Sequence, residues 1–146
     1  PMSIDTRLLS IVAAVIVDDE GRVLLVRKHG SGTFIQPGGK REPGEDALTT
    51  LARELREELG VTLVEGSARR LGEFEAEAVN EPGRRVRAEA FAVDINGSPA
   101  ARAEIAELRW IDVDAAIEGT DGAVRVAPLS ARHLLPAWRA RHRTGG

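Results

Sequence analysis

Cysteine is absent from this sequence of 146 residues. Without it the chain can hold neither a disulfide framework nor a thiolate nucleophile, and it lacks the commonest zinc ligand. The three histidines, His29, His133 and His142, are too scattered along the chain to suggest a metal site. Disulfide-stapled folds and cysteine catalysis are therefore excluded, and zinc binding is not expected.

Long apolar runs are absent as well. No segment approaches the roughly 20 apolar residues that a helix needs to cross a bilayer. The N-terminus also lacks the basic and then apolar pattern of a secretory signal. We therefore expect a cytoplasmic protein that has no membrane partner.

The sequence carries no large excess of charge of one sign. The formal net charge is −3 at pH 7 and the isoelectric point is near 5.7, so a partner such as long nucleic acid is not expected. Small polyanions can still bind at local sites. With 42% apolar residues, the length fits one domain over residues 1–146 with a single core, as a monomer or a homodimer.

Strand-like patterns occupy much of the chain. The first two apolar segments flank the turn sequence DDEG and predict a hairpin, and the turn sequence NEPG predicts a second hairpin or meander further on. The expected strands are residues 8–17, 22–28, 33–36, 62–66, 69–79, 85–95 and 104–112.

Two main helices are expected, one between these strands and one after the last of them. The first runs from about Asp46 to Leu59, with Asp46 or Gly44 near its N-cap and Gly60 as its C-terminal stop. The second covers residues 129–143 and should be kinked or split by Pro136. A short helix over 113–117 and a loop over 119–128 precede it. This alternation predicts an α/β fold in which a mixed sheet is covered on both faces.

The first helix carries an unusual set of charges. At about 100° per residue, five apolar residues form one stripe that should pack on the sheet, with the glutamates on the other side. The stripe is Leu48, Leu51, Ala52, Leu55 and Leu59, and the glutamates are Glu54, Glu57 and Glu58. Like charges three or four residues apart destabilise a helix, whereas Mg²⁺ prefers carboxylate oxygens together with substrate phosphates. The glutamates are either a solvated face or a cation site, to which a backbone carbonyl of Gly38 or Gly39 could add a ligand.

The segment from Gly39 to Val61 resembles the Nudix box, G-x5-E-x7-R-E-U-x-E-E-x-G-U, where U is a bulky aliphatic residue. The nine specified positions are filled by Gly39, Glu45, Arg53, Glu54, Leu55, Glu57, Glu58, Gly60 and Val61. The resemblance covers 23 residues directly, and the strand order around them is similar to the α/β/α sandwich of the Nudix hydrolase family.

This resemblance implies hydrolysis of a diphosphate bond in a nucleoside diphosphate that is linked to another group. It implies that Glu54, Glu57 and Glu58 bind Mg²⁺, with Mn²⁺ as an alternative, and that Arg53 orients the carboxylates. Glu45 would support the junction between loop and helix. The residues alone leave another interpretation open, in which Arg53 forms an ordinary ion pair with Glu57.

The general base is less defined. A divalent cation lowers the pKa of water, and a carboxylate then accepts the proton. In the family this carboxylate is either a box glutamate, here Glu57, or one from a loop outside the box. Glu104 and Glu107 are the late candidates, and Glu104 is preferred because its placement before Trp110 is similar to that of a metal-site acid in the family.

Substrate contacts are expected from five residues. Arg27 and Arg87 could meet phosphates, Phe34 and Trp110 could stack on a base, and Gln36 could read it. Each also has an ordinary reading, namely exposed strand arginines, core aromatics, and an amide directed at a sheet edge or solvent.

The identity of the substrate rests on what the residues after the box lack. Residues 76–79 hold neither the proline that ADP-ribose hydrolases tend to have there nor the tyrosine of diadenosine polyphosphate hydrolases. We therefore predict a MutT-like nucleoside triphosphate pyrophosphohydrolase, with ADP-ribose or a nucleotide sugar as the second choice. A non-catalytic Nudix-fold binding module is the alternative of another class, suggested by the basic amphipathic segment HLLPAWRARHR.

Overall fold

The computed structural model describes residues 7–144, with side chains described up to residue 142. The strands are β1 Leu8–Val15, β2 Arg22–Lys28, β3 Thr33–Phe34, β4 Gly38–Gly39, β5 Thr62–Leu63, β6 Arg69–Glu77, β7 Arg85–Ala92, β8 Ile95–Asn96, β9 Ile105–Asp112 and β10 Arg125–Val126. The helices are α1 Ala47–Leu59, α2 Val113–Glu118, the π-helix η1 Leu129–Leu134 and α3 Leu135–Thr144.

A mixed four-stranded sheet in the order β4-β1-β7-β6 forms the centre of the fold. β1 and β7 are parallel over their whole length, from Leu8 opposite Arg85 to Val15 opposite Ala92. β4 and β6 are antiparallel to their neighbours. The mixed sheet confirms the α/β class predicted from the sequence.

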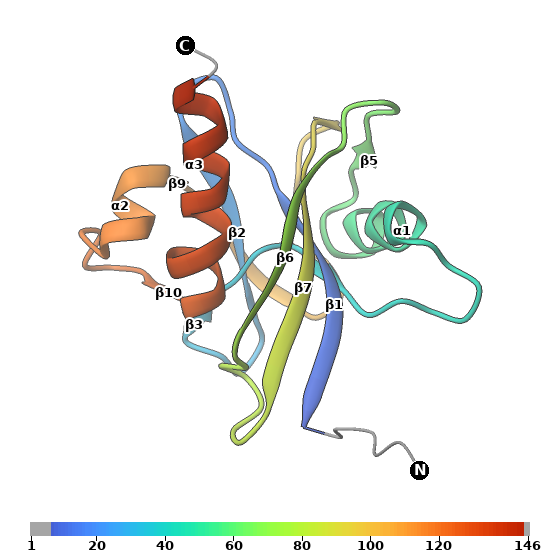
Figure 1. Cartoon of the computed structure of the whole chain (residues 1–146), viewed down its shortest axis with the longest axis horizontal. Helices are drawn as coiled ribbons and strands as arrows, with labels where there is room; N and C mark the ends of the chain where they lie inside the picture. Colours follow the sequence, from blue (N-terminus) through green and yellow to red (C-terminus); the bar gives the residue numbers. More distant parts are fainter. Residues whose placement is uncertain (1–6, 145–146) are drawn as a thin grey trace.

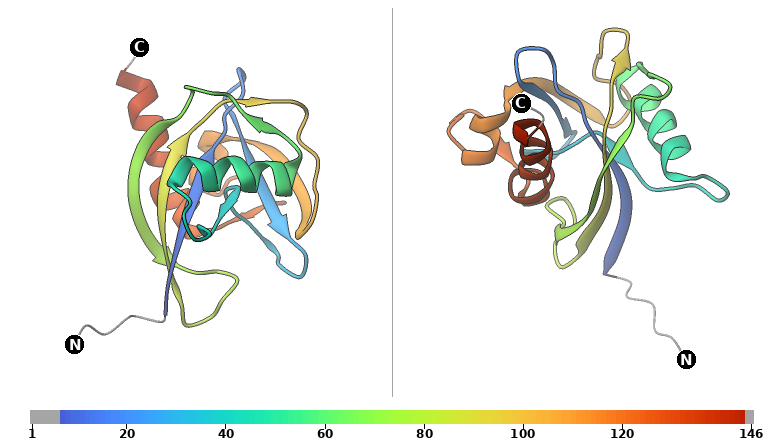
Figure 2. Two further views of the ribbon diagram at one scale, coloured as in Figure 1. Left: turned by 90° about the vertical axis from the view of Figure 1, so that its right-hand side faces the viewer. Right: turned by 45° about the horizontal axis from the view of Figure 1, so that its top comes forward.

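Helices cover both faces of this sheet, as Figure 1 shows, with α1 on one side and α3 on the other. The views in Figure 2 agree, since α1 crosses in front of the central strands in the left view. β1 is buried on both faces because Ala13 and Val15 join the core under η1 and α3, whereas Val12 and Ala14 join the core under α1. The predicted α/β/α sandwich is therefore confirmed.

The hairpin predicted for residues 8–28 is confirmed only next to its turn. β1 and β2 meet only next to the turn, through the bridge of Val17 with Val23 and the bond from the Leu24 N–H to the Ile16 carbonyl. Both edges of β1 are already taken by β4 and β7, so β2 pairs with β9 in a separate antiparallel sheet. The second predicted hairpin is confirmed, because β6 and β7 pair from Glu77 opposite Arg85.

α1 begins and ends where the sequence predicts. The Asp46 side chain accepts a hydrogen bond of 2.8 Å from the Thr49 N–H, and Gly60 closes the helix at a φ of 68°, a conformation that favours glycine. The predicted stripe needs two corrections. Leu48 is 39% exposed, and Glu58 is only 2% exposed, on the buried face. At about 100° per residue, Glu58 projects close to Leu55, so the separation of apolar and acidic faces was incomplete.

The C-terminal helix is split, as predicted for Pro136, into η1 and α3. The Leu135 N–H donates to the Ser130 carbonyl, five residues back, which is the wide turn of a π-helix. A proline lacks an N–H and its ring crowds the carbonyl four residues before it, so a wider turn ahead of Pro136 relieves both problems. Within residues 119–128, β10 interrupts the predicted loop by pairing with β3.

Over residues 7–144, no helix combines the length and the apolar character needed to span a bilayer.

Candidate active site

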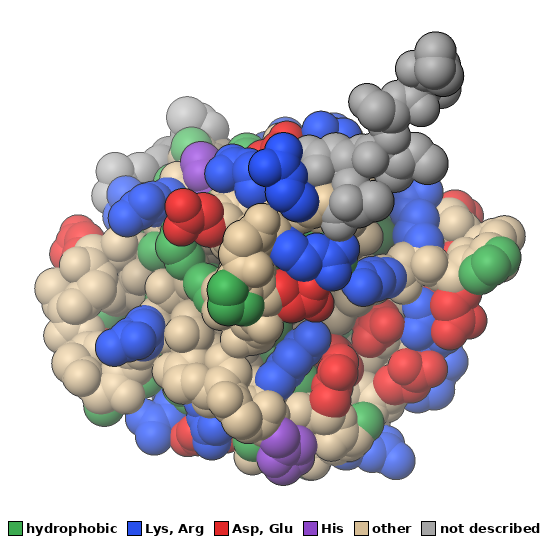
Figure 3. Space-filling view, turned by 90° about the horizontal axis from the view of Figure 1, so that it is seen from below, with side chains coloured by type: hydrophobic (Ala, Val, Ile, Leu, Met, Phe, Trp, Pro, Cys, Tyr) green, Lys and Arg blue, Asp and Glu red, His purple; other side chains and the backbone are tan. Residues whose placement is uncertain are grey.

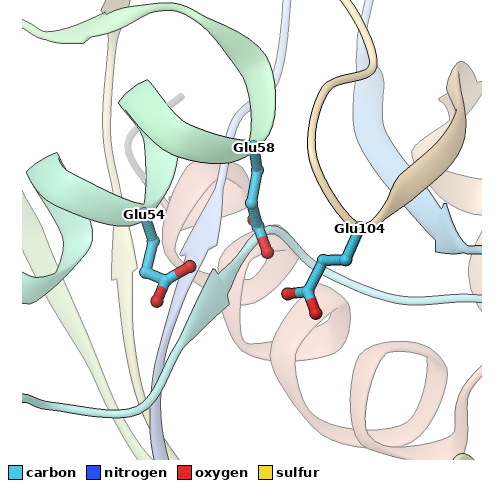
Figure 4. A group of neighbouring side chains, drawn as sticks. All are labelled: Glu54, Glu58 and Glu104. Atoms are coloured by element: carbon cyan, nitrogen blue, oxygen red, sulfur yellow. The ribbon is translucent and has the colours of Figure 1, made fainter.

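Three carboxylates converge beside the central sheet. Glu54 and Glu58 project from α1, and Glu104 projects from the segment just before β9. One carboxylate oxygen of each lies within 4.8 Å of one from each of the others. Figure 4 shows the three side chains directed into the same space from two different parts of the chain.

Glu58 is the buried member of this group. Its Oε1 accepts a hydrogen bond of 3.1 Å from the Gly38 N–H. Burial raises the pKa of Glu58 to about 8, with the charges of Glu54 and Glu104 acting in the same direction. Burial likewise raises the pKa of Glu54. The protein alone thus disfavours the ionised carboxylates, and a hard divalent cation with oxygen ligands would compensate their negative charge.

The two glycines of β4 let the loop approach these carboxylates. A Cβ on Gly39 would lie 2.5 Å from the Glu54 carboxylate, so a side chain here would displace it. A Cβ on Gly38 would lie 2.0 Å from the Val12 carbonyl oxygen, and its φ of 147° is one that other residues rarely adopt. Both glycines are required for close packing of loop, strand and helix.

Arg53 fastens the preceding loop to α1. Its guanidinium donates to both oxygens of Glu45, at 2.7 and 2.9 Å, to Glu54 at 2.9 Å and to the Lys40 carbonyl at 3.0 Å. Glu45 also accepts from the Glu42 N–H and the Thr50 hydroxyl. These bonds lower the pKa of Glu45 to about 2, and Arg53 is the largest cause. Glu45 thus supports the loop-helix junction, as the resemblance implies.

A cavity of about 440 Å³ opens beside the carboxylates. Glu54, Glu104 and the β4 glycines lie on its wall together with apolar, amide, hydroxyl and lysine side chains. Among the lining residues are Leu9, Ile11, Lys28, Gln36, Lys40, Asn80, Leu129 and Ser130. Its volume lies in the range of small-molecule sites.

Comparison with known proteins identifies the family behind this arrangement. The family model described as "NUDIX domain" matches residues 7–133. The chain belongs to the Nudix hydrolase family. Its members act on diphosphate bonds of small nucleotide substrates. The family predicted from Gly39–Val61 is therefore confirmed.

Individual relatives support this placement. The CTP pyrophosphohydrolase of Escherichia coli (strain K12) is 33% identical over 134 residues, which cover 88% of this chain and 94% of the relative. The solution structure of the E. coli ORF135 protein has a TM-score of 0.70 at 33% identity, covering 91% of this chain and 89% of that one. A MutT protein from Methanosarcina mazei Go1 has a TM-score of 0.73 at 25% identity, covering 96% and 99%.

Other matches cover less of the related protein. A MutT-like protein from Streptomyces ambofaciens is 44% identical over 50 residues, which are 34% of this chain and 32% of the relative. This chain spans about a third of the length of that relative, so its activity is left to be proposed.

Three of the four glutamates proposed for this Nudix site come together, and Glu57 lies outside the group. The side chain of Glu57 is 53% exposed and contacts Arg53 at 3.4 Å. This is the ordinary ion pair that the sequence analysis gave as the alternative role of Arg53. Glu104 lies with Glu54 and Glu58, and its Oε1 is 3.7 Å from the Nζ of Lys28. Glu107 instead pairs with Arg109 at 2.7 Å and Arg27 at 3.2 Å, and these bonds, Arg109 first, lower its pKa.

Of the five predicted substrate contacts, only Gln36 lines the cavity. Phe34 is 4% exposed and packs in the core under η1 and α3, and Trp110 packs beside the core under α1. Arg27 is bonded to Glu107 and to the Ser31 carbonyl. Strand alternation places Arg87 on the opposite sheet face from the cavity residue Val86, where Glu75 pairs with it at 3.2 Å. Figure 3 shows such mixing of acidic and basic side chains over one side of the molecule.

Sequence reasoning missed the two lysines and the hydroxyl group on the cavity wall. Lys28 ends β2 directly after Arg27. The sequence indicated a basic residue at the end of this strand, but it did not indicate that Lys28 rather than Arg27 lines the cavity. Lys40 follows Gly39, and Ser130 is 1% exposed within η1. No local pattern marks Ser130, because only the docking of η1 brings it to the cavity.

Proposed function

We propose that this Nudix hydrolase cleaves nucleoside triphosphates to a nucleoside monophosphate and pyrophosphate, in a reaction that depends on Mg²⁺ or Mn²⁺. The observation that carries the proposal is the cluster of Glu54, Glu58 and Glu104, of which Glu54 and Glu104 lie on the wall of a cavity of about 440 Å³. The name of the E. coli relative, a CTP pyrophosphohydrolase, supports a triphosphate substrate.

The carboxylate cluster fits the cation. Glu54, Glu58 and Glu104 supply hard oxygen donors within 4.8 Å of one another, and a cation beside the buried Glu58 would favour its ionised form. Glu57 could complete the set after a rotation of its exposed side chain, and a carbonyl of Gly38 or Gly39 stays a proposed ligand. When bound, the ion would neutralise phosphate charge and lower the pKa of the attacking water.

Protein groups perform the remaining tasks. We propose that Glu104, which is 55% exposed at the cavity, accepts a proton from water through the carboxylate oxygen that it does not offer to the cation, whereas Glu107 is held by two arginines. Arg53 holds the Glu54 carboxylate in position through a bond of 2.9 Å. Lys28 and Lys40 line the same cavity, where their ammonium groups would offset the charge of a triphosphate.

Nucleotide sugars are the second candidate substrate class. A solved UDP-X diphosphatase has a TM-score of 0.62 at 27% identity, although the match covers 55% of that chain and 78% of this one. A binding module without catalysis is the other alternative. It gains nothing from three glutamates whose charges repel one another, so the intact cluster favours an enzyme.

A single screen tests the proposal. Formation of the nucleoside monophosphate would be measured by chromatography over the common nucleoside triphosphates, ADP-ribose and UDP-sugars, with Mg²⁺, with Mn²⁺ and with excess chelator, together with pyrophosphate release from the triphosphates. We expect turnover of a triphosphate that stops with chelator and returns with either metal. Turnover that persists in excess chelator would refute the metal site, and binding without turnover of any substrate would favour the binding module.

A further inference from the structure

Gln36 holds one end of its amide in a fixed direction. It is 6% exposed, and its Nε2 donates a hydrogen bond of 2.9 Å to the Ala14 carbonyl on β1. A carbonyl oxygen only accepts, so the amino end of the amide must be the one that faces Ala14. The other end of the side chain is therefore an acceptor, Oε1.

This acceptor has no hydrogen-bond partner among residues 7–144, although it is buried. Buried polar atoms in folded proteins are nearly always paired, and an unpaired one needs an explanation. Since Gln36 lines the cavity that contains Glu54 and Glu104, a donor on a bound molecule can supply the missing partner.

The surroundings of Gln36 suit the base of a nucleotide. Leu9, Ile11 and Leu129 give the cavity an apolar wall, against which the flat faces of a base can pack. Of the nearby amides, Asn80 is already engaged, because its Oδ1 accepts from the Ser31 hydroxyl at 2.6 Å. Gln36 thus offers a buried acceptor without a partner, on a residue that lines the cavity.

We propose that Gln36 selects nucleotides whose base carries an exocyclic amino group. This inference rests on the proposed function. Cytosine, adenine and guanine each present an amino group that can donate to Oε1, and its donation would not disturb the bond to Ala14. Uracil, thymine and hypoxanthine lack this amino group. Their ring N–H can also donate to Oε1, but the adjacent carbonyl oxygens are acceptors that repel Oε1 and weaken this bond.

The test uses substrates that differ by one amino group. The pairs are CTP with 2-pyrimidinone riboside triphosphate, and ATP with purine riboside triphosphate. For wild type we expect kcat/KM to favour the amino-bearing member of at least one pair by roughly 10-fold to 100-fold. The analogue has no donor for the buried Oε1 of Gln36, and leaving this acceptor unpaired weakens binding. Gln36→Leu should reduce the preference to within about 3-fold, through KM, while kcat for the preferred substrate stays within about 3-fold.

Two further variants make the result specific. Ser130→Ala removes the hydroxyl that also lines the cavity and should keep the preference for the amino group. Gln36→Met is an unbranched apolar replacement, for use if Gln36→Leu melts well below wild type. A preference that survives both Gln36 variants, or one that only Ser130→Ala removes, would overturn the inference.

A binding measurement separates this inference from the proposed function. Calorimetry would give Kd values for α,β-imido-CTP and α,β-imido-UTP, which keep the base and resist cleavage. We expect tighter binding of the cytosine analogue to wild type and equal binding to Gln36→Leu. Absence of turnover together with this pattern would refute the hydrolase and keep Gln36 as the reader, whereas equal Kd values for wild type would refute the reader alone.

Discussion

At the scale of single residues, Glu58 is the most constrained group of the site. It occupies the buried face of α1, where a leucine would normally pack, and it has one backbone donor, the Gly38 N–H. A carboxylate in such a place is costly when ionised and is neutral over a wide range of pH. Ionisation of Glu58 becomes favourable when a cation lies nearby.

The raised pKa of Glu58 predicts the pH dependence of stability in the metal-free protein. Its pKa is about 8 in the folded chain and 4.5 as the ordinary value, so between these values the folded state binds the additional proton. The free energy of unfolding should therefore fall as pH rises from about 4.5 to 8, by an upper limit of roughly 3 kcal/mol at pH 7. Thermal melts in excess chelator across this range measure the fall.

The matched variant is Glu58→Gln, which keeps the acceptor for the Gly38 N–H and cannot ionise. We expect its melting temperature in chelator to be higher than that of wild type at pH 8 and similar at pH 4.5. Identical pH profiles for the two proteins would show that Glu58 does not carry this dependence.

Glu104 allows a kinetic prediction. Glu104→Gln keeps size and hydrogen bonding but removes the proton acceptor, so kcat should fall by roughly 10²–10⁴ with little change in KM. Glu107→Gln is the matched control, because Glu107 is paired with Arg27 and Arg109 and lies outside the carboxylate group. If Glu107→Gln shows the larger loss of kcat, the role of base moves to Glu107.

At the scale of elements, the site depends on how closely β4 approaches α1. Gly39 lies against Glu54, and Arg53 holds the loop from Lys40 to Glu45 on the same side of the helix. The helix thus presents its carboxylates in a fixed relation to the loop. Hydrogen bonds of Nudix box side chains hold the loop and the helix together at this junction.

Gly39→Ala tests this junction. Its added Cβ would meet the end of the Glu54 side chain, which can move, so we expect the melting temperature to change little while the apparent affinity for Mg²⁺ in turnover falls by at least 10-fold. Gly32→Ala is the matched control, since a Cβ there has nothing within 4 Å and the residue does not line the cavity. A normal metal affinity in Gly39→Ala would show that Glu54 does not need its present position.

At the scale of the whole molecule, the carboxylate group joins two layers. Glu54 and Glu58 belong to α1, whereas Glu104 lies beside the β2–β9 sheet, where its carbonyl accepts from the His29 N–H at 3.0 Å. A cation held by all three would tie the helix to the second sheet. Metal binding should therefore stabilise the complete fold rather than one element.

Melting temperature should accordingly rise with Mn²⁺ or Mg²⁺ in the absence of nucleotide. At 100 times the dissociation constant the expected gain is about 2.7 kcal/mol, or about 5–11 °C for a domain of this size. Glu54→Gln and Glu104→Gln should each reduce the shift, and Glu57→Gln decides whether Glu57 joins the ligands. A melting temperature that ignores both metals up to millimolar concentration would contradict the proposed centre.

Local sequence predicted the parts of this protein that depend on neighbouring residues. α1 ends at the predicted caps because Asp46 and Gly60 act within one turn of the helix. The β6–β7 hairpin follows from two strands and the turn between them. The same reasoning failed for the pairing of β1 with β2 beyond the turn, because a turn between two strands does not reveal that both edges of the first are occupied by β4 and β7.

By itself, the sequence determined the family and the box residues, since nine positions at fixed spacing within 23 residues specify one loop and one helix. Only the tertiary structure decided that Glu58 is buried, that Glu104 rather than Glu107 meets Glu54, and that Gln36 lines the cavity while Phe34, Trp110, Arg27 and Arg87 do not. These outcomes depend on which elements pack against each other across long distances in the chain. Spacing along a sequence fixes the direction of a side chain, whereas packing decides what that side chain meets.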